Sequence, residues 1–457
     1  MMNSQIYRTF LSGLTCILML SAVSSCDRFS GLGVDPIEPG IADLSNYLAV
    51  GNSFTAGYQN NALYRSGQEY SYPNLLARQF RTPQEFIQPY ISDPGLGNRI
   101  ELTSLNPLET RVNPEQGQPV NQGEKPFHNL GIPGGLLVDY ANPNNIGNLK
   151  ERATDPDHPA FNPFYQIVMQ PSELSKSAPR IHNEVVALNP TLVTFWMGTN
   201  DIMGFVASGG EGSSFTDPAT FAQLYQLSAQ LLASLETDVV VYTVPRATSL
   251  PFVFNLRRDL RNDNLISFNQ STGVWELTTG QGSLPIYIRT DGGTRKMQLF
   301  DFPLMSASGY FSAVFTGEIA PPVTSDTAIP DFLVLDGPVS GGSGDSELAL
   351  ALGAVNQYNT AIRSIANSAG FLVMDAQVLF STVAGEFLSE GGGYASGSGT
   401  LRPIPGELFS FDGIHTGNVG NAVLANETIK LLNSNFGSNI PLIDISSIPE
   451  GFPTAVQ

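Results

Sequence analysis

Cysteine, histidine and positive charge are scarce in this chain, and each shortage excludes a class of protein. The 457 residues include two cysteines, Cys16 and Cys26, which cannot form a disulfide framework. The four scattered histidines form no cluster of metal ligands. Lysine and arginine number 22 against 41 aspartates and glutamates, and the net charge of −19 would repel nucleic acid. We therefore expect no metal and no nucleic-acid partner; glycine-rich stretches near Asp291 and Asp345 could bind calcium, but turn formation explains them more simply.

Long apolar runs are also lacking. The run from Phe10 to Val23 follows a single cation, Arg8, and is short for a membrane span but typical of a signal-peptide core. It ends in Val23-Ser24-Ser25-Cys26, which resembles the lipobox of bacterial lipoproteins. The resemblance implies removal of residues 1–25, lipidation of Cys26 and anchoring in a bacterial cell envelope, with the outer membrane as the expected location and its face left open. Ordinary secretion, with Cys26 as an incidental residue, is the alternative.

Short apolar runs alternate with helical patterns along the rest of the chain. Four runs have the length of buried strands, and three segments have the apolar spacing of helices. This alternation predicts a parallel sheet with helices on both faces, a three-layer α/β/α sandwich. The predicted strands are Tyr47–Val50, Leu192–Trp196, Val239–Val244 and Phe371–Met374, and the predicted helices are Ala219–Leu235, Ser346–Ser368 and Val419–Leu432.

Two stretches interrupt the alternation. The segment from Gln59 to Ile181 is rich in Asn, Pro and Gly, and we expect mostly loop with a few helices. Residues 250–344 have Thr-, Gly- and aromatic-rich runs, which predict a β-rich insertion that leaves through the Gly/Ser segment Ser340–Gly344. The expected organisation is a leader at 1–25, a tether at 26–44, one main domain at 45–440 that contains the insertion, and a tail at 441–457.

Two motifs could form a nucleophile and its base. The motif Gly51–Gly57 (GNSFTAG) directly follows the first predicted strand, so Ser53 would lie at the carboxyl edge of the sheet, where such folds bind ligands. Serine is a weak nucleophile that needs a base. In the motif DGIH, His415 can take its proton and Asp412 can orient the imidazole. An ordinary turn and a surface histidine are the alternatives.

Two further motifs could stabilise an oxyanion. GTND ends the second predicted strand, and the amide of Asn200 could donate to an oxyanion, although a helix N-cap would equally explain Asn200 and Asp201. The glycine-rich turn Asn129–Gly135 (NLGIPGG) could point a backbone N–H at the same oxygen.

The motifs GNSFTAG, NLGIPGG, GTND and DGIH resemble, in this order, the four blocks of the SGNH (GDSL) hydrolase family. The resemblance spans Tyr47 to about Leu432. It implies a flavodoxin-like SGNH-hydrolase fold and a serine esterase or lipase. Such an enzyme hydrolyses carboxylic esters through an acyl-enzyme and needs no cofactor.

The resemblance also assigns roles to single residues. It makes Ser53 the nucleophile, His415 the general base and Asp412 the residue that orients His415. The oxyanion donors would be the backbone N–H groups of Ser53 and Gly134 and the side chain of Asn200.

Three details of the resemblance stay open. Gly131 is an alternative to Gly134, because the second block has three glycines. Asn52 stands where the family usually has Asp, so the hydrogen bonding around Ser53 must differ. Asp201 is expected to hold its loop rather than to react.

The sequence does not choose the substrate. A carbohydrate O-deacetylase and a non-catalytic surface-binding lipoprotein on the same scaffold are alternatives to a lipid or acyl-ester hydrolase. The insertion at 250–344 could cap the pocket or recognise a glycan. Five apolar side chains near the predicted site could line an acyl pocket or pack the core, namely Phe54, Trp196, Met197, Met203 and Phe205.

Overall fold

The computed structural model describes residues 37–81, 85–105, 108–280, 282–339, 346–385, 394–396 and 399–453. The chain divides into residues 1–38 and 39–457, and the fold below is that of the second part. The expected leader, the lipidation site Cys26, the Ser340–Gly344 linker and Asp345 lie outside the described residues. Residues just before the expected start of the main domain already belong to its core, because Ala42 and Leu44 are buried.

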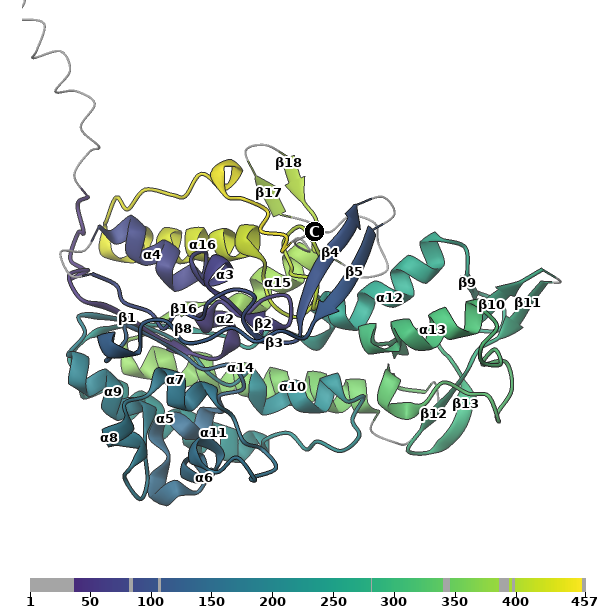
Figure 1. Ribbon diagram of the computed structural model, residues 1–457, viewed down its shortest axis with the longest axis horizontal. Coiled ribbons are helices and arrows are strands. Elements are labelled where there is room, and N and C mark those ends of the chain that lie inside the picture. Colours follow the sequence, from purple (N-terminus) through teal and green to yellow (C-terminus); the bar gives the residue numbers. More distant parts are fainter. Residues whose placement is uncertain are drawn as a thin grey trace, which may run out of the picture. The chain divides into compact units, whose positions relative to one another are not determined.

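A five-stranded parallel sheet forms the centre of the molecule (Figure 1). Numbered along the chain, its strands follow the order 2-1-3-4-5, which is the flavodoxin-like arrangement. The predicted α/β fold with a central parallel sheet is confirmed. The order across the sheet is β6 (Asn129–Gly131), β1 (Tyr47–Gly51), β7 (Leu192–Trp196), β8 (Asp238–Tyr242) and β16 (Leu372–Met374).

The register of the sheet brings three loops to the same edge. Gly51 at the end of β1 pairs with Gly131 on one side and with Trp196 on the other. The segments that follow β1, β6 and β7 therefore begin level with one another. In this fold the chain changes direction across the sheet between β1 and β7, and ligands bind at the carboxyl ends of the strands beside that point.

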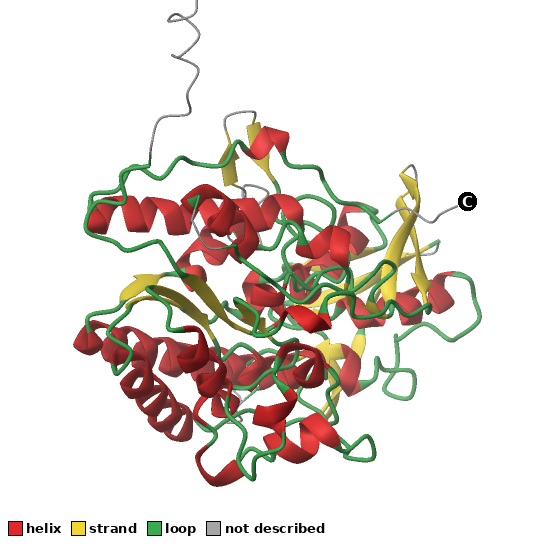
Figure 2. Ribbon diagram, turned by 60° about the vertical axis from the view of Figure 1, so that its left-hand side comes forward, coloured by secondary structure: helices red, strands yellow, loops and turns green. Residues whose placement is uncertain are grey.

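Helices cover both faces of the sheet, as Figures 1 and 2 show. Capping residues fix where two of the long helices begin. The Asp217 side chain accepts from the N–H groups of Ala219 and Thr220, and the Ser346 side chain accepts from that of Ala349. One face carries α4 (Tyr72–Phe80) and α16 (Asn418–Phe436), and the other carries α5 (Leu137–Ala141), α9 (Ile181–Leu188), α11 (Pro218–Ala233) and α14 (Glu347–Ala369).

The segment Gln59–Ile181 contains more strand than the sequence predicts. Strand β6 has three residues, too few to give a recognisable apolar run. Strands β4 (Arg99–Leu105) and β5 (Leu108–Asn113) form an antiparallel hairpin, in which charged residues such as Arg99 and Glu101 break the apolar pattern. The expectation of mostly loop with a few helices is therefore wrong for these strands.

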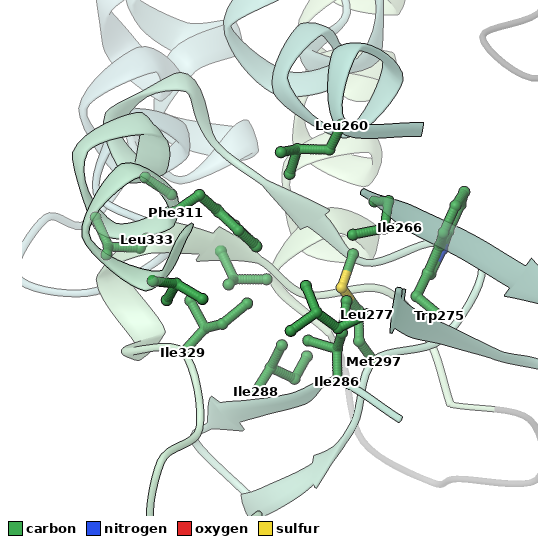
Figure 3. Packing of buried hydrophobic residues seen from close by; sticks show 13 residues of the cluster. Leu260, Ile266, Trp275, Leu277, Ile286, Ile288, Met297, Phe311, Ile329 and Leu333 are labelled. Atoms are coloured by element: carbon green, nitrogen blue, oxygen red, sulfur yellow. The ribbon is translucent and has the colours of Figure 1, made fainter. Parts of the chain in front are cut away.

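The segment predicted as a β-rich insertion has its own hydrophobic core. Its strands pack with two helices that the sequence does not predict, α12 (Pro251–Asn262) and α13 (Ser308–Phe315). Figure 3 shows Leu260, Trp275 and Phe311 converging on this core. Burial of each large apolar side chain contributes roughly 1.5–3 kcal/mol. The strands are β9 (Ile266–Asn269), β10 (Val274–Thr279), β11 (Gly282–Pro285), β12 (Tyr287–Thr290), β13 (Gly293–Lys296), β14 (Phe302–Pro303) and β15 (Val334–Leu335).

Candidate active site

Ser53 is the first residue of the short helix α2 (Ser53–Ala56), which begins directly after β1. Asn52 caps this helix, because its Oδ1 accepts from the Phe54 N–H at 3.0 Å. Position 51 has room only for glycine, because a Cβ there would lie 2.0 Å from Thr55 Oγ1. Gly57 ends the helix in the left-handed conformation with φ 79°. The tight turn between strand and helix places Ser53 at the carboxyl edge of the sheet.

The structure brings Ser53, His415 and Asp412 into one chain of hydrogen bonds. Ser53 Oγ lies 2.8 Å from His415 Nε2, and His415 Nδ1 lies 3.0 Å from Asp412 Oδ2. These distances suit proton transfer from a serine hydroxyl to a histidine that a carboxylate orients. Ser53 and His415 are 362 residues apart in the sequence.

The Asp412 carboxylate has donors on both oxygens. Its Oδ1 accepts from the N–H groups of Ile414 at 2.9 Å and His415 at 2.8 Å, and its Oδ2 accepts from the Asn61 N–H at 3.0 Å as well as from His415 Nδ1. Burial raises the pKa of this carboxyl, but the charge of His415 and the donated hydrogen bonds outweigh burial and lower the pKa from 3.8 to about 2. An ionised Asp412 holds the proton of His415 on Nδ1 and leaves Nε2 free to accept from Ser53.

Two aromatic rings limit the movement of the imidazole. The Phe54 ring lies 5.2 Å from the His415 ring, and the Tyr58 ring meets it edge-on at 5.0 Å. The His415 side chain is only 12% exposed. These contacts hold the imidazole against Ser53 and shield it from water.

Three N–H groups near Ser53 are available for an oxyanion. Asn200 is the first residue of α10 (Asn200–Ala207), and one N–H of its amide donates to the Gly135 carbonyl at 2.9 Å, which leaves the other N–H. Among the hydrogen bonds of the described residues, the backbone N–H groups of Ser53 and Gly134 have no acceptor. Gly134 is exposed and has φ 76°. Unpartnered donors at the edge of a site are what an oxyanion hole requires.

The N–H of Gly131, the alternative to Gly134, is not available for an oxyanion. The Gly131 N–H already donates to Asn129 Oδ1 at 2.9 Å, and as the last residue of β6 Gly131 pairs with Gly51 of β1. Gly134, three residues later, lies in the turn after the strand. In the motif NLGIPGG, Gly131 therefore belongs to the sheet, and the N–H of Gly134 is available for an oxyanion.

Asp201 ties the start of α10 to the segment after Gly134. Its Oδ2 accepts from the Leu137 N–H at 3.0 Å, and its Oδ1 accepts from Thr216 Oγ1 at 2.8 Å. Burial raises the pKa of its carboxyl to about 6 in spite of these bonds. Asp201 thus links the segment after Gly134 to the start of α10, which agrees with a role in holding its loop.

Asn52 uses its side-chain oxygen and leaves its side-chain nitrogen without a partner. Its Oδ1 still caps α2, but its buried Nδ2 has no hydrogen-bond partner within the described chain. A buried donor without a partner costs roughly 1–3 kcal/mol. The replacement changes the local bonding and leaves Ser53 bonded to His415.

The apolar residues considered for an acyl pocket pack the core instead. Phe54 stacks on Trp196 with ring centroids 4.7 Å apart, and Trp196 stacks on Tyr242 at 4.9 Å. The structure therefore favours core packing over an acyl pocket for this set. The exposed fraction is at most 9% for all five, namely Phe54, Trp196, Met197, Met203 and Phe205.

Two contacts at the Asp412–His415 loop have no signal in the sequence. The Asn61 N–H reaches Asp412 from the segment after α2. The Phe252 N–H, at the start of α12, donates to the Gly413 carbonyl at 2.8 Å, and a Cβ on Gly413 would lie 2.4 Å from Met305 Sδ. The insertion therefore borders the loop that carries His415.

The described residues include no group of three or more His, Cys, Asp and Glu side chains placed to hold a metal ion. Among the described helices, none has the length and apolarity needed to cross a membrane.

No family model and no curated protein match this chain. Among solved structures, it is similar to an α/β hydrolase enzyme from the metagenome of Lake Arreo, Spain, with 12% identity and a TM-score of 0.35 over 86% of this chain and 96% of that one. It is also similar to an acetyl xylan esterase, with 14% identity and a TM-score of 0.28 over 66% of this chain and 77% of that one. With TM-scores below 0.5 and identities below 15%, these similarities do not indicate what this chain does, so its function has to be inferred from the site.

Proposed function

We propose that this chain is a serine hydrolase that cleaves carboxylic esters through an acyl-enzyme on Ser53. One observation carries the proposal, the hydrogen-bonded series from Ser53 Oγ through His415 to Asp412. A serine hydroxyl that a neutral imidazole deprotonates, next to unpartnered N–H groups, is suited to attack a carbonyl carbon.

The reaction would proceed in two halves. His415 Nε2 takes the hydroxyl proton while Ser53 Oγ bonds to the carbonyl carbon, and the electron pair of the carbonyl moves to its oxygen. When this oxyanion collapses, the bond to the alcohol breaks and His415 gives the alcohol its proton. Water then repeats the sequence on the acyl-enzyme and releases the acid and Ser53.

The oxyanion would be stabilised by three donors, the N–H groups of Ser53 and Gly134 and the free N–H of Asn200. These donors are fixed before the reaction by α2, by the turn after β6 and by the start of α10. Donors of this kind act most strongly on the charge that forms in the transition state. The geometry therefore supports acyl transfer.

Hydrolysis of p-nitrophenyl esters tests the proposal. The wild-type chain should release p-nitrophenol with saturation kinetics, and Ser53→Ala should not exceed the background rate. The stability of Ser53→Ala should be measured alongside, to show that the variant is folded. Equal rates for the two proteins would contradict the proposal, and would favour a non-catalytic binding protein on this scaffold.

One observation bears on the substrate. The apolar side chains that could have formed an acyl pocket, such as Trp196 and Met197, lie in the core. The sequence argument for substrates with long acyl chains therefore no longer holds. A carbohydrate O-deacetylase becomes the second candidate. A series of p-nitrophenyl esters from acetate to palmitate, with acetylated xylan in parallel, separates the two. A rate that falls steadily with chain length supports small acyl groups, and a maximum at long chains supports lipid esters.

We also propose that the mature chain is anchored to a membrane of a bacterial envelope through lipid on Cys26. This rests on the sequence Val23-Ser24-Ser25-Cys26 at the end of the apolar leader. The substitution Cys26→Ala should move the protein from the membrane fraction to the soluble fraction. If the variant stays in the membrane fraction, the lipid anchor is wrong.

A further inference from the structure

Asn60 lies between the two loops that carry the nucleophile and the acid. It follows helix α2 and its side chain is buried, with 3% of the residue exposed. Asn60 and Asn61 both have the left-handed backbone conformation, with φ of 52° and 59°. Outside glycine, asparagine is among the few residues that adopt this conformation readily. The pair turns the chain from α2 toward the segment just before Asp412.

Every polar group of Asn60 is hydrogen-bonded. Its N–H donates to Ser410 Oγ at 2.9 Å, and its Oδ1 accepts from the Phe411 N–H at 2.8 Å. Its Nδ2 donates to Tyr64 Oη at 2.7 Å, and its carbonyl accepts from the Ile100 N–H at 2.8 Å. Two of these four bonds join it to the residues directly before Asp412, and the other two hold it to its own side of the site.

The next residue continues the connection to the reacting groups. The Asn61 N–H donates to Asp412 Oδ2, the same oxygen that contacts His415 Nδ1. A shift of Asn60 relative to Phe411 would therefore move a donor away from the oxygen that orients the base. On the other side, Ser53 O accepts from the Tyr58 N–H at 3.0 Å, so the same segment is bonded to the nucleophile's own backbone.

We propose that Asn60 is a positioning residue, which acts through Asp412 and sets the register between the Ser53 segment and the Asp412–His415 loop. The proposal rests on the proposed function of these residues. Only asparagine combines the left-handed backbone with both a small acceptor for Phe411 and a donor for Tyr64. Glycine keeps the backbone conformation and loses both side-chain bonds, so Asn60→Gly isolates the contribution of the side chain.

A second buried asparagine provides a matched control. Asn142 is fully buried, has φ 32° and donates from Nδ2 to the Pro179 carbonyl at 2.7 Å. It ends helix α5 and contacts none of Ser53, Asp412 and His415. Asn142→Gly is therefore the same chemical change at the same kind of position, and both variants should lose stability.

The kinetics of the two variants should differ. In Asn60→Gly we expect kcat for p-nitrophenyl acetate to fall about 10- to 100-fold with little change in KM, because small misplacements of reacting groups cost rate rather than binding. Asn142→Gly should keep the wild-type kcat. A wild-type kcat in folded Asn60→Gly, or an equal loss in Asn142→Gly, would overturn the proposal.

The position of the base can also be read without any turnover. In protein labelled with ¹⁵N-histidine, the Nδ1–H of wild-type His415 should show the signal of a hydrogen bond to a carboxylate. This signal should weaken or exchange faster in Asn60→Gly and stay unchanged in Asn142→Gly. If the wild type cleaves no ester, the proposed function fails. The Nδ1–H signal of His415 then still decides whether Asn60 positions Asp412. An unchanged signal in Asn60→Gly contradicts the positioning role.

If Asn60→Gly does not fold, Ser410→Ala tests the same register from the opposite loop. It removes only the hydroxyl that accepts from the Asn60 N–H. A lost hydrogen bond of this kind should lower kcat about 3- to 10-fold without a matching rise in KM. An unchanged kcat in folded Ser410→Ala would count against the proposal.

Discussion

The two sides of the candidate site differ in how completely their hydrogen bonds are made. On the acid–base side, both oxygens of Asp412 accept bonds, and the series through His415 to Ser53 is continuous. On the oxyanion side, the N–H groups of Ser53 and Gly134 have no acceptor among the described residues, and Asn200 uses one amide N–H of two. The hydrogen bonds of the acid–base side are all made in the resting protein, whereas the oxyanion side still has N–H groups without an acceptor among the described residues.

The proposed function would explain this difference by when each interaction is needed. The base must be oriented and must have the correct tautomer before the substrate arrives, so its bonds belong to the ground state. The oxyanion exists only during the reaction, and donors that wait for it stabilise the transition state more than the substrate. The comparison therefore predicts larger losses for changes to the completed side than for single changes to the open side.

The largest expected effect is that of Asp412→Asn. The amide would place a donor where His415 Nδ1 needs an acceptor and would favour the wrong tautomer. By analogy with serine proteases we expect kcat to fall about 10⁴-fold. Asp217→Asn, at the N-cap of α11, is the matched control and should keep kcat. A loss of less than about 10-fold in Asp412→Asn would mean that Asp412 does not orient the base.

A smaller loss is expected for Asn200→Ala on the open side. Removal of one oxyanion donor costs about 10²- to 10³-fold in kcat, and KM should change little because the bond forms mainly in the transition state. Asn356→Ala, an exposed asparagine of α14, should behave as wild type. If Asn200→Ala raises KM and leaves kcat unchanged, its amide binds the substrate and does not stabilise an oxyanion.

The two buried carboxyls should affect stability in opposite directions as the pH changes. Asp201 has a pKa raised by burial to about 6, so the folded protein binds its proton more tightly than the unfolded chain. Its contribution to the free energy of unfolding is complete below the unfolded pKa of about 4 and is lost as the pH rises through 6. Relative to Asp201→Asn, the wild type should lose about 3 kcal/mol of stability between pH 3 and pH 7. A pH-independent difference in urea unfolding would contradict this.

The contribution of Asp412 to the free energy of unfolding should change with pH in the opposite direction. It is the smallest of the four predicted effects. The pKa of this carboxyl is lowered to about 2, because the His415 charge and the donated N–H groups outweigh burial. Its contribution is therefore present above pH 4 and is lost as the pH falls through 2. Relative to Asp412→Asn, the wild type should lose about 2 kcal/mol between pH 5 and pH 2. A difference that grows toward acid pH would mean that the carboxylate is not stabilised by its donors.

The sequence was sufficient for the parts of the fold that carry strong local patterns. The strand Leu192–Trp196 is buried along its whole length and reads as a continuous apolar run. The start of helix α11 is recognisable from Asp217 as N-cap and Pro218 as the first helical residue. Strand β6 was missed, because three residues carry no period. The helices α12 and α13 were missed within a segment whose turns and aromatic residues are typical of strands.

At the candidate site, motifs were sufficient for residues whose chemistry is visible in the sequence. Ser53, Asp412 and His415 stand in recognisable spacing, and the structure brings them together. Their roles stay predictions. Asn60 could not be found in this way, because its partner Phe411 is 351 residues away and an Asn-Asn pair reads only as a turn. Proximity in sequence left open whether Trp196 lines a pocket or packs the core, and the structure buries it at the end of β7.

Covalent labelling of Ser53 tests the central claim most directly. A fluorophosphonate reacts with a serine only when a base activates its hydroxyl and N–H donors receive the phosphoryl oxygen. Mass spectrometry of the labelled wild-type protein should place a single adduct on the peptide that contains Ser53, and Ser53→Ala should carry none. An unlabelled wild type, or equal labelling of Ser53→Ala, would show that this residue is not the nucleophile of a serine hydrolase.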